Sequence, residues 1–270
     1  MRAFRVLFAE AIRDGLRRRL ALVVAVALVL GLASAQSCTQ IGVGDLTMNG
    51  QRIDPAVIAG FLAPLLYASQ AITVLAIAGL VAAEHLARPL GEGSAALWLA
   101  RPVSREAWAG ARLAGVVAIA LLSGIVLLGG TGALLVARQG VTIGPALAGA
   151  AATALGAVVV AALTMAASLS LGRSAVMLLM MAGLTIVLVA NSLGMAVDLA
   201  HPDVEFGGVL GTVDRFGPPL FTAIAAAVAP WNPHVEAGAA FPSAMLRLAV
   251  WAVGSVVLLL ALFRRREIEG

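Results

Sequence analysis

Lysine is absent from this sequence, and cysteine occurs once, at Cys38. A single cysteine cannot form an internal disulfide, and it cannot build a thiolate metal site by itself. The glycine-rich phosphate loop of nucleotide hydrolases needs a lysine on the phosphates, so we do not expect this chain to hydrolyse ATP. Charged residues make up only 12% and apolar residues 61%. Soluble domains have about a quarter charged and about half apolar residues, so this composition indicates an integral membrane protein.

The length of 270 residues leaves room for one membrane domain and little else. The net charge of +4 comes from eighteen arginines, and in a membrane protein it reports orientation, so we expect no nucleic-acid binding. The first residues resemble a signal peptide that would be cut after Ala35. They combine an arginine-rich start, an apolar run from Leu20 and the small residues "ASAQSC". The lead of about 19 residues before the apolar run is long for a signal peptide, so we expect this segment to remain as an anchor.

Apolar runs predict an all-α fold with six membrane spans. The runs cover about 20–35, 55–83, 109–137, 145–171, 175–199 and 243–263. The polar, glycine-containing stretch from Gln36 to Asp54 predicts an exposed loop, and "RQGVTIGP" predicts the turn of a membrane hairpin. Asn191 and Ser192, inside the fifth run, either hydrogen-bond to another helix or take part in ordinary helix packing.

Arginine placement predicts the orientation. With both termini in the cytoplasm, only Arg52, Arg138, Arg215 and Arg247 of the eighteen arginines lie outside. Positive charge gathers on the cytoplasmic side of membrane proteins, and an even number of spans returns both ends to one side. We therefore expect a multi-pass protein with cytoplasmic termini.

Two segments on that side have patterns of their own. Residues 1–18 predict an amphipathic helix, either in the membrane interface or serving only as a topology signal. Residues 84–108 form a cytoplasmic connection longer than two adjacent spans need, in which "LWL" offers apolar contact and Pro102 with Ser104 favours a helix start. This connection predicts either a docking element for a cytoplasmic partner or a loop resting on the lipid headgroups.

The stretch "EGSAALWLARPVSRE" resembles the cytoplasmic signature of ATP-binding-cassette (ABC) type-2 permeases, with serine where threonine is commoner. The amphipathic start, the six-span plan and the closing "LFRRREI" are also similar to that family. The resemblance extends to permeases that help mature nitrous oxide reductase. It implies a type-2 ABC exporter permease architecture in a bacterial inner (cytoplasmic) membrane.

The resemblance also implies partners and site residues. Two copies of a separate ATPase subunit, which binds ATP and Mg²⁺, would drive a pair of permeases, so this chain would hold no cofactor and no metal. A homodimer is expected, with a heterodimer as the alternative. The ATPase-coupling residues would be Glu92, Gly93, Ser94, Leu97, Leu99, Arg101, Pro102, Val103, Ser104 and Arg105. The connecting helix would contribute Phe4, Arg5, Phe8, Ile12 and Arg13.

The resemblance leaves the work of such a complex open between export of a substrate and mechanical action on an extracytoplasmic partner protein. A membrane scaffold or assembly factor without transport activity is the alternative from another class. An enzyme is not expected, because no span pairs a nucleophile with a base.

Residues 200–242 are expected to lie outside the membrane. Within them, the apolar run in 218–230 is too short to span and predicts a re-entrant helix. The nearby His201, Asp203 and Glu205 match no metal-ligand spacing, so we interpret them as solvated loop residues.

Overall fold

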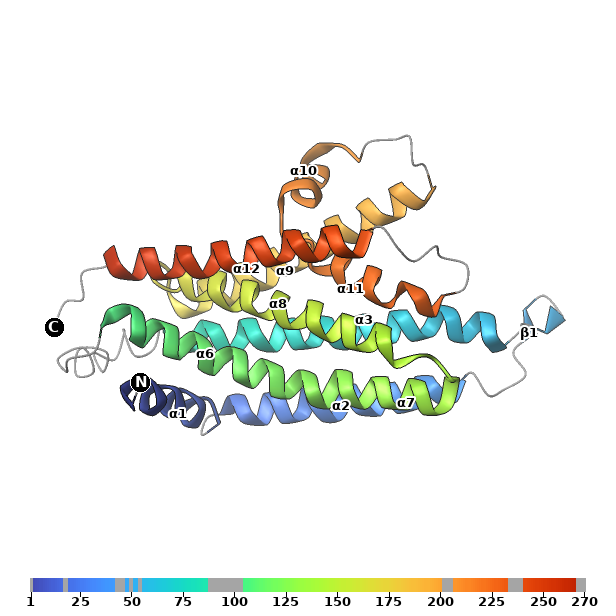
Figure 1. The fold of residues 1–270 in the computed structure, drawn as a ribbon, viewed down its shortest axis with the longest axis horizontal. Helices are drawn as coiled ribbons and strands as arrows, with labels where there is room; N and C mark the ends of the chain where they lie inside the picture. The colour runs from blue at the N-terminus through green and yellow to red at the C-terminus, as the bar shows by residue number, and fades with distance from the viewer. Residues whose placement is uncertain are drawn as a thin grey trace.

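The computed structural model describes residues 2–16, 19–41, 47–48, 51–52, 55–86, 104–200, 206–232 and 240–265. Long helices run side by side along the long axis of an elongated bundle (Figure 1). In chain order the elements are α1 (Arg2–Leu16), α2 (Arg19–Ile41), β1 (Thr47–Met48), β2 (Gln51–Arg52), α3 (Pro55–His85), α6 (Arg105–Gly124), the π-helix η1 (Ile125–Gly129), α7 (Gly130–Gln139), α8 (Ile143–Ala167), α9 (Arg173–Ala200), α10 (Gly208–Phe216), α11 (Leu220–Val228), the 3₁₀-helix η2 (Ala229–Trp231) and α12 (Ala240–Arg265).

Five helical stretches in the described part of the chain are long and apolar enough to cross a membrane. They are Gly60–His85, Arg105–Gln139, Ile143–Ala167, Arg173–Val197 and Phe241–Arg265. These stretches correspond to the second through sixth predicted spans, so the prediction of an all-α fold compatible with a multi-pass membrane protein is confirmed. The first predicted span lies in α2, whose apolar part is shorter, at Val24–Cys38. The count of six spans therefore stays a prediction.

One predicted boundary was wrong. Helix α2 continues to Ile41, although Gln36 to Asp54 was predicted to be a loop. The hydroxyls of Ser34 and Ser37 donate to the carbonyls of Gly31 and Ala33, so these polar side chains are satisfied within the helix. Of the cytoplasmic segment predicted at 84–108, Glu84 and His85 belong to α3 and α6 begins at Arg105, while residues 87–103 lie outside the described residues.

Helix α8 is the centre of the bundle and packs against α3, α12, α11 and α6. Small residues allow this close packing. A Cβ atom on Gly149 would lie 2.7 Å from Cε1 of Tyr67, and one on Gly156 would lie 3.0 Å from Cδ2 of Leu75. The Tyr67 hydroxyl donates to the carbonyl of Ala146 at the start of α8. These contacts fix the register between α3 and α8.

The turn predicted at "RQGVTIGP" is confirmed between two long apolar helical stretches, and its place in a membrane stays a prediction. Helix α7 ends at Gln139, and Gly140 follows in the left-handed conformation, with φ of 67°. Its N–H donates to the carbonyl of Val136 at 3.2 Å, as at many helix C-termini that close on glycine. The chain then turns into α8 at Ile143.

Helices α10 and α11 lie in the segment predicted at 200–242. Helix α11 with η2 falls on the short apolar run and inserts into the bundle, with Leu220, Ile224 and Val228 buried. Asn191 of α9 holds both elements: its Nδ2 donates to Oδ1 of Asp214 at 2.9 Å, and its Oδ1 accepts from the N–H of Phe221 at 3.2 Å. Of the two predicted polar residues, Asn191 therefore bonds across elements, whereas the Ser192 hydroxyl donates to Val189 within its own helix.

The two ends of the bundle are distinct. The end of α3, the start of α6, the start of α9 and the end of α12 lie at the same end as α1, where both chain termini are found (Figure 1). We call this the α1 end and the opposite one the far end. Arg138 belongs to the end of α7 at the far end, and Arg215 and Arg247 belong to α10 and the first half of α12, away from the α1 end, whereas Arg105, Arg112 and Arg173 belong to the α1 end. The described arginines thus separate as the sequence predicted.

Candidate functional site

Helix α1 docks on the bundle through a narrow strip of small and apolar side chains. Leu7 is 6% exposed and Ala11, one turn further, is fully buried. Residues four apart lie on one helix face, so these two form the contact strip. Its partner is Gly115 of α6, where a Cβ atom would lie only 2.7 Å from Cβ of Ala11. The glycine therefore permits the close approach of α1 to α6.

His85 joins α1 to the last turn of α3. Its ring is buried, with Nε2 lying 3.1 Å from the carbonyl oxygen of Ala11 and Nδ1 lying 3.0 Å from that of Val81. Ala11, whose side chain packs on Gly115, thus also contacts His85 through its backbone carbonyl. Two helices hold Ala11 from two sides, and α1 becomes part of the bundle.

The start of α6 is fixed by a side-chain cap. The Ser104 hydroxyl oxygen accepts from the N–H of Ala107 at 3.1 Å, and Glu106 lies in the first turn. Such a cap satisfies one of the free N–H groups at a helix start, and an acidic residue there complements the helix dipole. Arg105 beside the cap is exposed. The predicted role of Pro102 and Ser104 is thus confirmed for Ser104, whereas Pro102 lies outside the described residues.

One turn after the cap, Trp108 joins α6 to the end of α12. Its ring stacks on Phe263, with centroids 5.6 Å apart and planes 21° from parallel. Both side chains are fully buried, and the guanidinium of Arg112 lies 5.4 Å from the Trp108 ring centroid. A cation over an aromatic face is attracted by the ring quadrupole, which helps to retain this buried arginine. Nearby, Glu106 and Arg264 are 3.9 Å apart but exposed, so that pair contributes little.

An ion pair links α3 to α9 at the same end. The Arg173 guanidinium donates to Oε1 of Glu84. The Glu84 side chain is 10% exposed and that of Arg173 is 57% exposed. The sequence indicated only that both residues lie near span ends, because nothing in the spacing tells which two ends meet.

The residues predicted for the site divide into three groups. Ser104 and Arg105 begin α6. In α1, Phe4, Arg5 and Arg13 are exposed, while Phe8 and Ile12 are half-buried. Outside the described residues lie Glu92, Gly93, Ser94, Leu97, Leu99, Arg101, Pro102 and Val103.

The described part of the chain offers packing contacts and exposed helix surfaces at the α1 end. It contains no cluster of three histidine, cysteine or carboxylate residues that could hold a metal. His201, Asp203 and Glu205 lie outside that part. What the α1 end presents is an exposed edge of α1 beside a capped helix start. Such an arrangement suits contact with another protein.

No protein-family model matches the chain, and no curated protein matches it.

Proposed function

We propose that this chain is the membrane permease subunit of an ABC transporter whose ATP is hydrolysed by a separate subunit. Its action would be export of a substrate or mechanical work on an extracytoplasmic partner. The proposal starts from the resemblance of "EGSAALWLARPVSRE" to the type-2 permease signature. The lack of lysine agrees with ATP hydrolysis on another chain.

One observation carries the proposal. The resemblance assigns two separate segments to the ATPase interface, and in this structure both attach to helix α6. The signature ends in the Ser104 cap of α6, and α1 packs on Gly115 of the same helix. Eleven residues of helix separate these points by about 16 Å. A single rigid helix would therefore receive force from both halves of an ATPase-facing surface.

The contacts of the α1 end suggest how that force would spread. Residues 87–103 join α3 to α6, so a partner that displaces them pulls on both helices. The Trp108–Phe263 stack would pass the movement from α6 to α12, and the Glu84–Arg173 pair would pass it from α3 to α9. Nucleotide binding on the partner would then select between two arrangements of these packed helices.

Span count, orientation and assembly complete the proposal. If α2 crosses the membrane in addition to the five longer stretches, the chain has six spans. With the α1 end in the cytoplasm, the arginines then follow the positive-inside rule. The host membrane would be a bacterial inner membrane. Two such chains would pair, most simply as a homodimer, and each would bind one ATPase subunit. Native mass spectrometry of the complex tests this pairing: one copy of the chain beside a related permease supports a heterodimer, and one copy alone refutes pairing.

The central test is loss of coupling. The chain would be co-expressed with a candidate ATPase subunit, sought first among the genes next to its own, and both co-purification and ATPase stimulation would be measured. Arg101→Glu with Arg105→Glu should leave membrane insertion intact and abolish both signals, because two cations on the docking segment are reversed. Arg138→Glu, an exposed arginine at the far end, is the matched control. Normal binding and stimulation in the double variant would refute the coupling role.

A further inference from the structure

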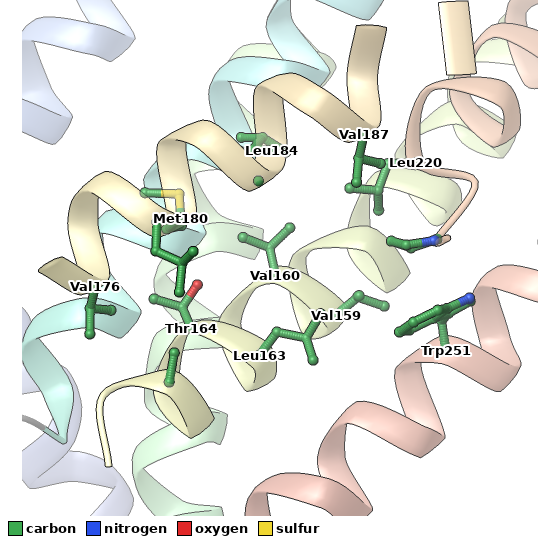
Figure 2. A pocket seen from close by; sticks show the side chains of 14 residues that line it. Val159, Val160, Leu163, Thr164, Val176, Met180, Leu184, Val187, Leu220 and Trp251 are labelled. Carbon is green, nitrogen blue, oxygen red and sulfur yellow. The ribbon is translucent and has the colours of Figure 1, made fainter. Parts of the chain in front are cut away.

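A groove runs between α9 and α12 over the surface of α8. Helix α8 packs closely on α12, whereas α9 packs mainly on α3, α10 and α11. The resulting cavity has a volume of about 230 Å³. Val160 and Leu163 of α8 form its floor, and Trp251 of α12 closes one side (Figure 2).

The lining is hydrocarbon. Among the described residues, no ionisable side chain lines the groove, and Thr164 contributes the one hydroxyl. An apolar cavity of about 150 Å³ already stays dry and takes up a benzene-sized molecule, so this larger one favours hydrocarbon over water. Leu179 on its rim is 52% exposed, so the groove opens sideways, out of the bundle. Since α8, α9 and α12 are all long enough to span a membrane, the medium on that side is lipid.

The groove has the length of one leaflet. On α9 its lining extends from Val176 to Val187, which is about 16 Å of helix. The hydrocarbon core of a bilayer is about 30 Å thick, so the groove matches half of it. Pro218 and Leu220 at the start of α11, together with Trp251, close the inner end. A single acyl chain entering from the α1 end would therefore fit up to the middle of the membrane.

A cation lies at the start of α9, on the helix face that lines the groove. Arg173 precedes Val176, Met180, Leu184 and Val187 by 3, 7, 11 and 14 residues, which is the spacing of one helix face. On α12, Arg265 lines a separate hollow with Glu106 and Arg264, so it is not assigned to the groove. The Arg173 side chain is 57% exposed. The fork of Arg173 has five N–H donors, so its bond to Glu84 leaves others for a phosphate.

We propose that this groove binds an anionic phospholipid of the leaflet at the α1 end, with one acyl chain along α8 and the phosphate at Arg173. The apolar floor selects a hydrocarbon chain, and the Arg173 guanidinium selects a negative headgroup. Zwitterionic lipids share the chain but lack the net charge, so they bind more weakly.

Gly183 provides a way to fill the groove without disturbing the helices. It lines the cavity, and a Cβ atom there would meet nothing within 4 Å. Gly183→Leu takes the space of several methylene groups, so retention of phosphatidylglycerol should fall about tenfold or more. Gly183→Ala should reduce it less. The matched control is Gly254→Leu, because Gly254 is an equally open glycine of α12 outside the lining.

The charges are tested separately. Arg173→Gln should lower the preference for phosphatidylglycerol over phosphatidylcholine about fivefold, since one cation near a membrane surface has about that effect. Arg265→Gln removes a cation that lines a separate hollow, so it should change the preference little. Arg215→Gln, an exposed arginine on α10, should change nothing.

Native mass spectrometry of the detergent-purified protein, titrated with each lipid, measures retention and copy number together, and thermal melting confirms folding of each variant. The proposal is supported if the wild type retains phosphatidylglycerol over phosphatidylcholine and both Gly183→Leu and Arg173→Gln reduce that retention. It is overturned by equal retention of the two lipids, or by undiminished retention in Gly183→Leu. If Gly183→Leu instead separates a dimer and leaves lipid bound, the groove holds a second copy of the chain, which also overturns it.

Discussion

The replacement Gly115→Ala should loosen α1 from the bundle. Atoms in ordinary contact lie about 3.5–4.0 Å apart. The new Cβ would lie 2.7 Å from Cβ of Ala11, so α1 would have to move away by about 1 Å. His85 limits that movement, because its Nε2 lies 3.1 Å from the carbonyl of the same alanine. Overpacking of this kind costs about 1–3 kcal/mol.

The higher helix propensity of alanine stabilises the variant and so opposes the clash. A control variant has to cancel this contribution. Alanine stabilises a helix interior relative to glycine by about 1 kcal/mol. Gly110→Ala on the same helix gains that term as well, and its Cβ meets nothing within 4 Å. The difference between the two variants therefore isolates the clash with Ala11.

Hydrogen–deuterium exchange of the α1 amides measures undocking directly, since local opening is read out as loss of protection. A loss of about 1–3 kcal/mol raises the open population about 5- to 150-fold. Gly115→Ala should show that increase relative to Gly110→Ala, and adding Ala11→Gly should reverse most of it by returning the space. Equal exchange in the two alanine variants would show that the contact does not hold α1, and the reasoning would be wrong.

Three further predictions concern the far end and the orientation. Asn191→Leu should lower thermal stability by about 1–3 kcal/mol because two hydrogen bonds to Asp214 and Phe221 are lost, whereas Ser192→Ala should change it little; a melting curve without that difference contradicts the role of Asn191. Tyr67→Phe should cost about 0.5–1.5 kcal/mol through its lost bond to Ala146, measured in the same way, and an unchanged melt would mean that the bond contributes nothing. With Cys38 replaced by serine, Asn49→Cys and Gly207→Cys should react with an impermeant thiol reagent outside the cell and Ser94→Cys should not; labelling of the last would reverse the orientation.

Much of the bundle was predictable because each long helix is a nearly uninterrupted apolar run. Such runs predict helices from local sequence alone, whatever each helix packs against. Gly140 likewise indicated the hairpin turn from local sequence. The helix of residues 36–41 was missed because polar residues indicated a loop. In α2, serine hydroxyls donate to carbonyls of their own helix, so polar residues there are compatible with a helix.

The site was less predictable, because its contacts join distant segments. Helical spacing indicated an apolar face for α1 but did not show which residues of that face would be most buried. The buried pair is Leu7 and Ala11, while the larger Phe4 is 42% exposed. That outcome depends on Gly115, about a hundred residues away, whose missing side chain admits only a small partner. Likewise, the Trp108–Phe263 stack depends on which two helix ends meet.

Different kinds of bond hold α12 near its start and at its end. Near the start of α12, Nη2 of Arg247 donates to the carbonyls of Asp214, Arg215 and Gly217, and at the far end of the bundle the Trp231 indole N–H donates to the carbonyl of Thr142 at 2.8 Å. Each of these bonds ties a side chain to backbone, which cannot move without the whole element. At the α1 end, α9 and α12 are held by side-chain contacts, the Glu84–Arg173 pair and the Trp108–Phe263 stack. If a partner pushes on residues 87–103, the α1 end would therefore shift first, with the far end as the pivot.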